Sequence, residues 1–200
     1  KFCNAVGKVD DACVAAVASK DQKRAWRFAK RHGIEDFYSD YEHLLAREDI
    51  DAIYIATTHN FHYENIIACL KHNKPVLCEK SMVPTAAQAQ EIFSLAKEKK
   101  LFVMEAMWSR FLPHINQARQ WIKEGRIGNL EAATCAIGFS ASRDPAHRIN
   151  NPELGGGAAY DIGVYAIELT TYLIDEPVID VQSMLTRSET GVDKTDSILL

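Results

Sequence analysis

The stretch DAIYIATTHNFHYENIIACLKHNKPVLCEK, from Asp51 to Lys80, decides the fold. It contains two continuous apolar runs, 51–57 and 75–78, which are typical of strands covered on both faces. Between them lies an apolar stripe with helical spacing, formed by Tyr63, Ile66, Ile67 and Leu70. Asn60 precedes the stripe and has the residue type of a helix cap. A strand, a helix and a second strand in this order predict a βαβ unit with parallel strands.

The same alternation continues on both sides of this unit. The apolar run Ala12–Ala18 predicts a strand, and the helical pattern after it ends at Gly33, a natural helix stop. Downstream, Thr85–Gln88 has the spacing of a capping box and opens a helix that reaches about Lys99. The run Leu101–Met104 predicts a further strand. Together these elements predict a Rossmann-type, doubly wound parallel sheet, with ligands at the carboxyl ends of its strands.

The second half of the chain has a different pattern. His114–Gly125 predicts an amphipathic helix, and Leu130–Phe139 predicts a strand with partial alternation. The segment Gly155–Ile174 is glycine-rich at its start and helical afterwards. Val178–Arg187 and Asp196–Leu200 predict strands of a second, open and mainly antiparallel sheet. We therefore predict a first domain over residues 1–108 and a second α/β domain over 109–200.

Composition excludes several classes of function. The chain has 200 residues, of which 47% are hydrophobic, and a net charge of -4, which argues against a nucleic-acid surface. No apolar run approaches the roughly 20 residues of a membrane span, and we expect no signal peptide. The five cysteines form no CxxC pair, so we expect reduced, mostly core cysteines in a cytoplasmic protein.

The sequence lacks one expected feature of a dinucleotide-binding fold. Such folds normally begin with a strand and a GxGxxG loop, and neither is present here. Lys1–Asp11 has the pattern of the helix that would follow that loop, and the final strand stops abruptly at Leu200. We expect both domains to be incomplete, the first at its N-terminus and the second at its C-terminus. The alternatives are a complete short protein, or a chain that binds no cofactor because it lacks the glycine loop.

Four ordered motifs resemble one oxidoreductase family. They are VLCEK (76–80), LFVMEAMWSRFLP (101–113), GGGAAYDIGVY (155–165) and ETGVDKT (189–195). In order and spacing they are similar to the Gfo/Idh/MocA family, and within it to the branch of dimeric dihydrodiol dehydrogenases and NADP-dependent D-xylose dehydrogenases. The resemblance implies a Rossmann domain that binds NAD(P), a second domain for substrate binding and dimerisation, and an enzyme that oxidises CH–OH groups.

Two family motifs carry the implied chemistry. The family's EKP motif corresponds to Glu79, Lys80 and Ser81, so serine replaces the proline. Its DxGxHxxD motif corresponds to Asp161, Gly163, Tyr165 and Glu168. Tyrosine in the histidine position resembles the dihydrodiol dehydrogenase branch, whereas glutamate in the last position departs from the wider family.

The resemblance implies that Tyr165 exchanges the hydroxyl proton, that Lys80 assists it, and that Asp161 orients the lysine or a substrate hydroxyl. A phenol has a pKa near 10, so we expect the nearby ammonium to lower it. The two side chains should then lie within hydrogen-bond reach or one bridging water. The residues alone leave structural alternatives: a core tyrosine on a helical stripe, a solvated loop lysine and a helix-capping aspartate.

The segment SKDQKR, 19–24, bears on the choice of cofactor. NAD-binding folds usually place an acid at the end of this strand. Here Ser19, Lys20 and Arg24 offer a hydroxyl and two cations that suit a 2′-phosphate, so we predict NADP, with NAD as the alternative. Asp21 is an acid in this segment and therefore favours NAD, although it has the position of a helix cap. By resemblance, further cofactor contacts are expected from Thr57, Thr58, Asn60, His62, Glu79 and Lys80.

Substrate contacts are expected from a smaller set. The candidates are Trp108, Phe139, Arg148 and Asp161. We expect Arg110 to form a structural salt bridge, and we expect no metal site at His59 and His62, because no third ligand has suitable spacing. The expected partners are a small polyol, sugar or dihydrodiol and a second copy of the chain, with no nucleic acid or membrane. The alternative functions are another sugar or cyclitol dehydrogenase and a non-catalytic NAD(P)-binding regulator.

Overall fold

The computed structural model describes all 200 residues and contains the predicted parallel strands. In the first half, β1 (Ala16–Ala18) pairs with β2 (Asp36–Tyr38). A separate sheet has the order β3 (Ile53–Ile55), β4 (Val76–Cys78), β5 (Val103–Glu105), and every pairing in both sheets is parallel. The fold therefore confirms the predicted Rossmann-like α/β architecture.

Helices connect these strands, as the sequence predicts. They are α1 (Phe2–Val6), α2 (Gln22–His32), α3 (Tyr41–Leu45), α4 (His62–Lys71) and α5 (Ala86–Lys99). Gly33 ends α2 in the left-handed conformation, and the Thr85 side chain caps α5 by accepting the Gln88 N–H, which confirms both predicted boundaries. The cap predicted at Asn60 is wrong, because the 3₁₀ turn η1 (His59–Phe61) precedes α4 and Asn60 accepts the Thr58 hydroxyl instead.

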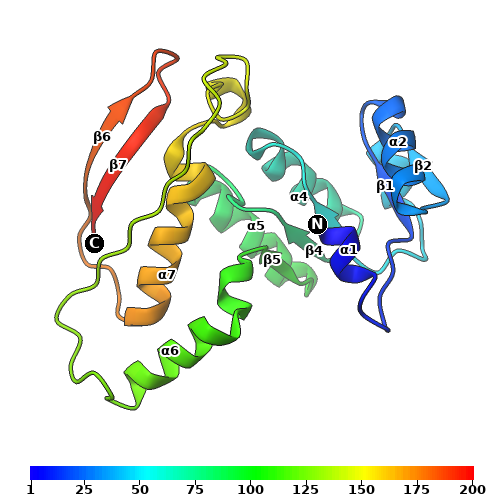
Figure 1. Cartoon of the computed structure of the whole chain (residues 1–200). Helices are drawn as coiled ribbons and strands as arrows, with labels where there is room; N and C mark the ends of the chain where they lie inside the picture. Colours follow the sequence, from blue (N-terminus) through cyan, green and yellow to red (C-terminus); the bar gives the residue numbers. More distant parts are fainter.

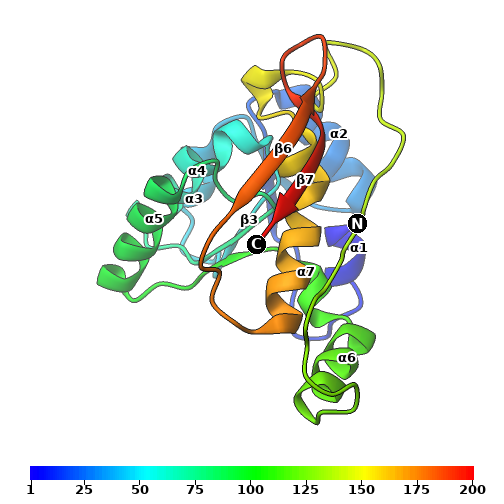
Figure 2. The same ribbon diagram turned by 90° about the vertical axis from the view of Figure 1, so that its left-hand side faces the viewer.

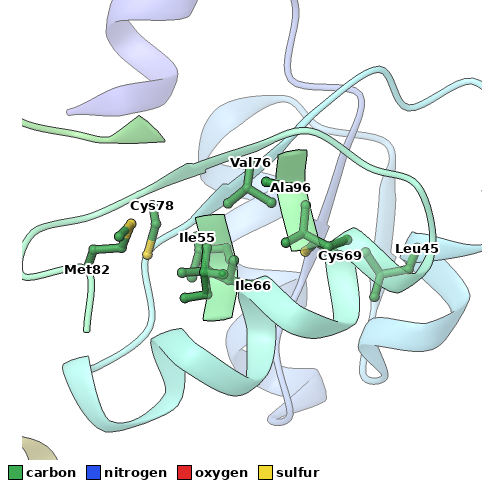
Figure 3. Close-up of a cluster of buried hydrophobic side chains, with 10 residues drawn as sticks. Leu45, Ile55, Ile66, Cys69, Val76, Cys78, Met82 and Ala96 are labelled. Atoms are coloured by element: carbon green, nitrogen blue, oxygen red, sulfur yellow. The ribbon is translucent and has the colours of Figure 1, made fainter. Parts of the chain in front are cut away.

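The hydrophobic core lies between the β3–β5 sheet and helices α4 and α5 (Figure 3). Ile66, Leu70 and Ile92 are fully buried there. Cys69 and Cys78 are part of this cluster, and burial raises the pKa of the Cys69 thiol to about 12. All five cysteines are free, but only Cys69 and Cys78 are buried. Cys3 is half-buried and Cys13 and Cys135 are exposed, so the expectation of mostly core cysteines is wrong. This packing fixes the β3 and β4 ends that carry the site.

The second half adds helices and an antiparallel hairpin. Its elements are η2 (Trp108–Phe111), α6 (Pro113–Lys123), the 3₁₀ turn η3 (Pro152–Leu154), the π-helical turn η4 (Ala159–Gly163), α7 (Val164–Ile174), β6 (Gln182–Arg187) and β7 (Asp193–Leu199). Helix α7 lies between the β3–β5 part and the β6–β7 hairpin (Figures 1 and 2). No helix is long and apolar enough to cross a membrane.

Several predicted boundaries need correction. The strand predicted at Leu130–Phe139 is absent, since residues 130–144 have no regular structure and no strand pairs with them. Strand β1 begins at Ala16 rather than Ala12 because its pairing with β2 starts only there. Strand β2 and helix α3 were not predicted, since each is too short to show a clear period.

Candidate active site

A cleft of about 580 Å³ lies at the carboxyl ends of β1, β3 and β4. This edge is where parallel α/β sheets bind ligands. The second half of the chain completes the wall with Arg148, Leu154 and Asp161, so the cleft lies between the two halves. Of the predicted site residues, those that line it are Ser19, Lys20, Arg24, Thr57, Thr58, Glu79, Lys80, Arg148 and Asp161.

Lys80 lies directly after β4 and reaches across to the second half. Its ammonium donates to the backbone carbonyl of Asp161 and pairs with the carboxylate Oδ1 at 3.3 Å. An ammonium has three protons to donate, so these two contacts leave one donor position open. The lysine two residues after the core strand is therefore held by Asp161 beside the cleft.

Asp161 is buried and lies between two cations. Its Oδ1 accepts a hydrogen bond from Arg148 Nη1 at 2.8 Å in addition to the contact with Lys80. Burial raises the pKa of this carboxyl, but Arg148 and Lys80 outweigh burial and hold the pKa below its usual value. Asp161 is therefore held in its anionic form, paired with Lys80 and with Arg148.

Tyr165 is half-buried, one helical turn after Asp161, and it does not itself line the cleft. The Lys80 ammonium lies 5.4 Å from the centre of its ring, and the direct hydrogen bond between the two is absent. Instead, Trp108 Nε1 donates to the Tyr165 hydroxyl at 2.8 Å.

The electrostatic prediction for Tyr165 also needs correction. Burial raises the pKa of this phenol, the Trp108 hydrogen bond lowers it, and the net result is a pKa above the ordinary value. We predicted a lowered pKa from the ammonium of Lys80. The prediction is wrong because burial and the negative charges of Glu79, Asp161 and Glu105 raise the pKa, while the ammonium of Lys80 is paired with Asp161.

Two histidines hold the loop after β3 in place. His59 places its ring nitrogens 2.9 Å from the Gly155 carbonyl and 3.1 Å from the Lys80 carbonyl. His62 lies between the carbonyls of Thr57 and Ser81 and is fully buried. Because no atom of the His62 side chain is exposed, we replace its predicted cofactor contact with a structural role.

The turn after β4 shows what the EKS sequence does. Ser81 Oγ donates to the Tyr160 carbonyl at 2.9 Å, which joins this turn to η4. Glu79 accepts a hydrogen bond from the Tyr54 hydroxyl while remaining in the cleft wall. The serine in place of proline therefore supplies a further contact between the two halves.

The remaining predicted contacts do not line the cleft. Asn60, Trp108 and Phe139 are not among its lining residues, and Phe139 lies in the exposed segment 130–144. Conversely, sequence reasoning missed Tyr41 and Phe61, whose rings lie 5.9 and 5.1 Å from the Lys20 ammonium. Phe61 adjoins the loop already singled out by Thr57 and Thr58, whereas Tyr41 begins the unpredicted helix α3 and carries no sequence signal.

Glu168, which stands where the wider family motif has aspartate, is buried, and both of its carboxylate oxygens accept hydrogen bonds. It accepts hydrogen bonds from Ser109 Oγ at 2.7 Å and from Arg110 Nε at 2.6 Å. The structural salt bridge expected for Arg110 is therefore present. This pair ties η2 to α7 next to Tyr165.

Comparison with known proteins identifies the family. Residues 1–107 match the model described as "Oxidoreductase family, NAD-binding Rossmann fold" of GFO_IDH_MocA, and residues 115–200 match "GFO/IDH/MocA C-terminal domain".

The chain belongs to the Gfo/Idh/MocA family. Trans-1,2-dihydrobenzene-1,2-diol dehydrogenase of Xenopus tropicalis is 36% identical over 191 residues, which are 95% of this chain and 57% of that protein. D-xylose 1-dehydrogenase (NADP(+)) of Hypocrea jecorina is 35% identical over 220 residues, covering 99% of this chain and 56% of that protein. The chain thus spans little more than half the length of these Gfo/Idh/MocA relatives.

Solved structures agree with this assignment. The 3-ketoreductase KijD10 of Actinomadura kijaniata, in complex with NADP and TDP-benzene, superposes with a TM-score of 0.86 at 29% identity. The match covers 97% of this chain and 59% of that one. A Gfo/Idh/MocA fold of the same kind therefore holds a dinucleotide and a nucleotide-linked ligand in that relative.

Proposed function

We propose that the chain carries the cofactor cleft and acid–base residues of an NADP-dependent dehydrogenase. The reaction would exchange a hydride between the nicotinamide and a secondary hydroxyl of a trans-dihydrodiol or an aldose such as D-xylose. The observation that carries this proposal is the meeting of Lys80, Asp161 and Tyr165 beside the strand-end cleft. The names of the Xenopus and Hypocrea relatives support the substrate class.

The cleft wall fits NADP better than NAD. Ser19, Lys20 and Arg24 bring a hydroxyl and two cations to one side of the cleft. The nearby acid, Asp21, caps α2 by accepting the Arg24 N–H at 3.1 Å, and this hydrogen bond lowers its carboxyl pKa. A 2′-phosphate would find cations there, whereas Asp21, which also lines the cleft, has one carboxylate oxygen engaged in the helix cap.

The proton chemistry follows from the hydrogen bonds. When bound, the nicotinamide supplies or accepts the hydride. In reduction, the Tyr165 O–H bond breaks and its proton passes to the substrate oxygen; in oxidation, the phenolate accepts the hydroxyl proton. The open donor position of Lys80 holds the same substrate oxygen, while Asp161 and Arg148 keep the ammonium in place. Because burial keeps Tyr165 protonated at neutral pH, oxidation should accelerate as pH rises.

The test is NADP⁺ reduction by the full-length protein with a trans-dihydrodiol and with D-xylose, followed by NADPH absorbance. Tyr165→Phe should lower kcat by about 100-fold or more, as expected when a general acid–base group is lost. Tyr172→Phe is the matched control, because Tyr172 lies on the same helix and its hydroxyl donates to Asn116 instead. Full activity of Tyr165→Phe would refute the assigned role, and NADPH binding without any turnover would favour a non-catalytic regulator.

The cofactor choice has its own measurement. Arg24→Ala should raise the Kd for NADPH about tenfold and leave the Kd for NADH unchanged, because only NADPH carries the extra phosphate. Arg27→Ala is the control on the same helix, since its Nε donates to the Lys23 carbonyl and it does not line the cleft. Equal effects of Arg24→Ala on both cofactors would contradict the assignment of NADP.

A further inference from the structure

Three consecutive residues of η2 are fastened to two residues of α7. Trp108 donates to Tyr165 at 2.8 Å, and both Ser109 and Arg110 donate to Glu168. Tyr165 and Glu168 are three positions apart, so they lie on the same face of their helix. The indole contact is therefore part of an organised clamp between η2 and α7.

Building on the proposed function, we propose that Trp108 is a positioning residue for the acid–base step. Its indole N–H holds the Tyr165 oxygen and leaves the phenolic proton free for a substrate oxygen. Glu168 supports this arrangement by fixing the turn that presents the indole.

The direction of the hydrogen bond between Trp108 and Tyr165 shows which group can accept the phenolic proton. An indole N–H can only donate, and a lysine ammonium can only donate. Of the groups around the Tyr165 phenol, Trp108 and Lys80 can only donate. The carboxylates whose charges raise its pKa, Glu79, Asp161 and Glu105, form hydrogen bonds with other partners and none with its hydroxyl. The phenolic O–H must therefore find its acceptor elsewhere, and a substrate carbonyl oxygen beside Lys80 would provide one. After transfer, the indole N–H stabilises the negative charge left on the tyrosine oxygen.

Apolar packing alone does not account for Trp108. The residue is 57% exposed, so it buries little surface for a side chain of its size. Its ring meets Tyr165 nearly edge-on, with an interplanar angle of 70° and 6.0 Å between ring centres. Glu168 is buried by contrast, and a buried carboxylate with two donors fixes the neighbouring backbone far more firmly than an exposed one.

The experiment compares wild type, Trp108→Phe and the control Trp121→Phe in the full-length protein. Trp121 lies on α6 beside Arg126, so its replacement makes the same chemical change away from Tyr165. The titration of Tyr165 is followed by tyrosinate absorbance, as the difference from Tyr165→Phe. Trp108→Phe should raise the midpoint by about one pH unit, which is tenfold in the acid constant, and Trp121→Phe should leave it unchanged.

The same shift should appear in the pH profile of kcat/KM for alcohol oxidation. Glu168→Gln keeps an acceptor for Ser109 but weakens the pair with Arg110, and should reproduce part of the shift. Trp108→His keeps a ring N–H, so the midpoint of its Tyr165 titration should lie between those of wild type and Trp108→Phe. This second variant also keeps the inference testable if Trp108→Phe does not fold.

The outcomes separate this inference from the proposed function. A lower rate at every pH with an unmoved midpoint would make Trp108 a pocket wall only and overturn the inference. A shifted tyrosinate midpoint in a protein that turns over no alcohol would support the hydrogen-bond role while the proposed function failed.

Discussion

Asp161→Asn tests the electrostatic centre of the site. The substitution keeps the size of the side chain and an acceptor oxygen but removes the charge. Lys80 then loses the negative charge 3.3 Å from its ammonium and keeps only neutral acceptors, the backbone carbonyl at position 161 and the amide oxygen. Only 15% of the lysine side chain and 8% of the aspartate side chain are exposed, so water replaces the lost partner poorly.

The expected loss of stability can be worked from these distances. Coulomb's law with an effective dielectric of about 20 gives about 5 kcal/mol for opposite charges at the separation of Lys80 and Asp161. The remaining carbonyl contact offsets part of this, and breaking a buried pair by removing one partner costs about 3 kcal/mol or more. Arg148 is half-exposed, so its pair with Asp161 adds less than about 1 kcal/mol. We therefore expect Asp161→Asn to lower the free energy of unfolding by about 3 kcal/mol.

The pH dependence has a definite sign. The folded state holds the pKa of Asp161 below its unfolded value, so the stabilisation is fully present above about pH 4 and disappears as pH falls through the lower folded pKa. The difference between wild type and Asp161→Asn should accordingly be constant near neutral pH and shrink only in acid.

Urea denaturation at neutral pH measures the effect. A cycle of Asp161→Asn, Lys80→Met and the double variant isolates the pair, and we expect a coupling of about 3 kcal/mol. The exposed Asp11→Asn is the matched control and should change stability by less than about 0.5 kcal/mol. A coupling below about 0.5 kcal/mol would show that Asp161 does not hold Lys80 through its charge and would refute the reasoning.

Two further predictions concern the turn at Gly155, next to the cleft, and the β6–β7 hairpin. Gly155 has φ +71°, and a Cβ there would lie 2.8 Å from His59 Cβ. Gly155→Ala should therefore lower the free energy of unfolding, measured by urea denaturation, by about 2 kcal/mol or more. The control Gly191→Ala, at φ +87° in open space, should lower it by about 1 kcal/mol. Burial and the neighbouring Asp193 raise the pKa of Asp196 to about 6, so the folded state loses stability as pH rises from about 4 to 6. Asp196→Asn should remove this loss and stabilise the protein by about 1 kcal/mol at pH 8, after allowance for partial exposure, with no gain at pH 4. An equal gain in stability at both pH values would contradict the raised pKa of Asp196.

The parallel sheet could be predicted because its signals are local. The runs that became β3 and β4 are short, apolar and bounded by a helix whose stripe has the right period. The strand predicted at Leu130–Phe139 had similar composition, but a strand also needs a hydrogen-bonding neighbour, and apolar patterning carries no information about one. Strand β2, in contrast, has a pairing partner in β1 but almost no sequence pattern, because it is only three residues long.

Some residues of the candidate site could likewise be predicted from the sequence, and others could not. Lys80, Asp161 and the cationic residues of 19–24 could be placed at the cleft because strand ends and motif spacing locate them. The partner of the Tyr165 hydroxyl could not be predicted, since Trp108 lies 57 positions earlier and no spacing rule joins them. The burial of His62 was equally hidden, because two carbonyls from separate segments satisfy its ring.

The two departures from the wider family motifs share one physical role. Serine in place of proline at position 81 gains a hydroxyl that donates to the Tyr160 carbonyl. Glutamate in place of aspartate at position 168 is longer by one methylene, and its two oxygens receive Ser109 and Arg110. Both side chains form hydrogen bonds to the segments that carry Asp161 and Tyr165. The side chains at these two motif positions therefore connect the segments that carry the candidate site to β4 and to η2.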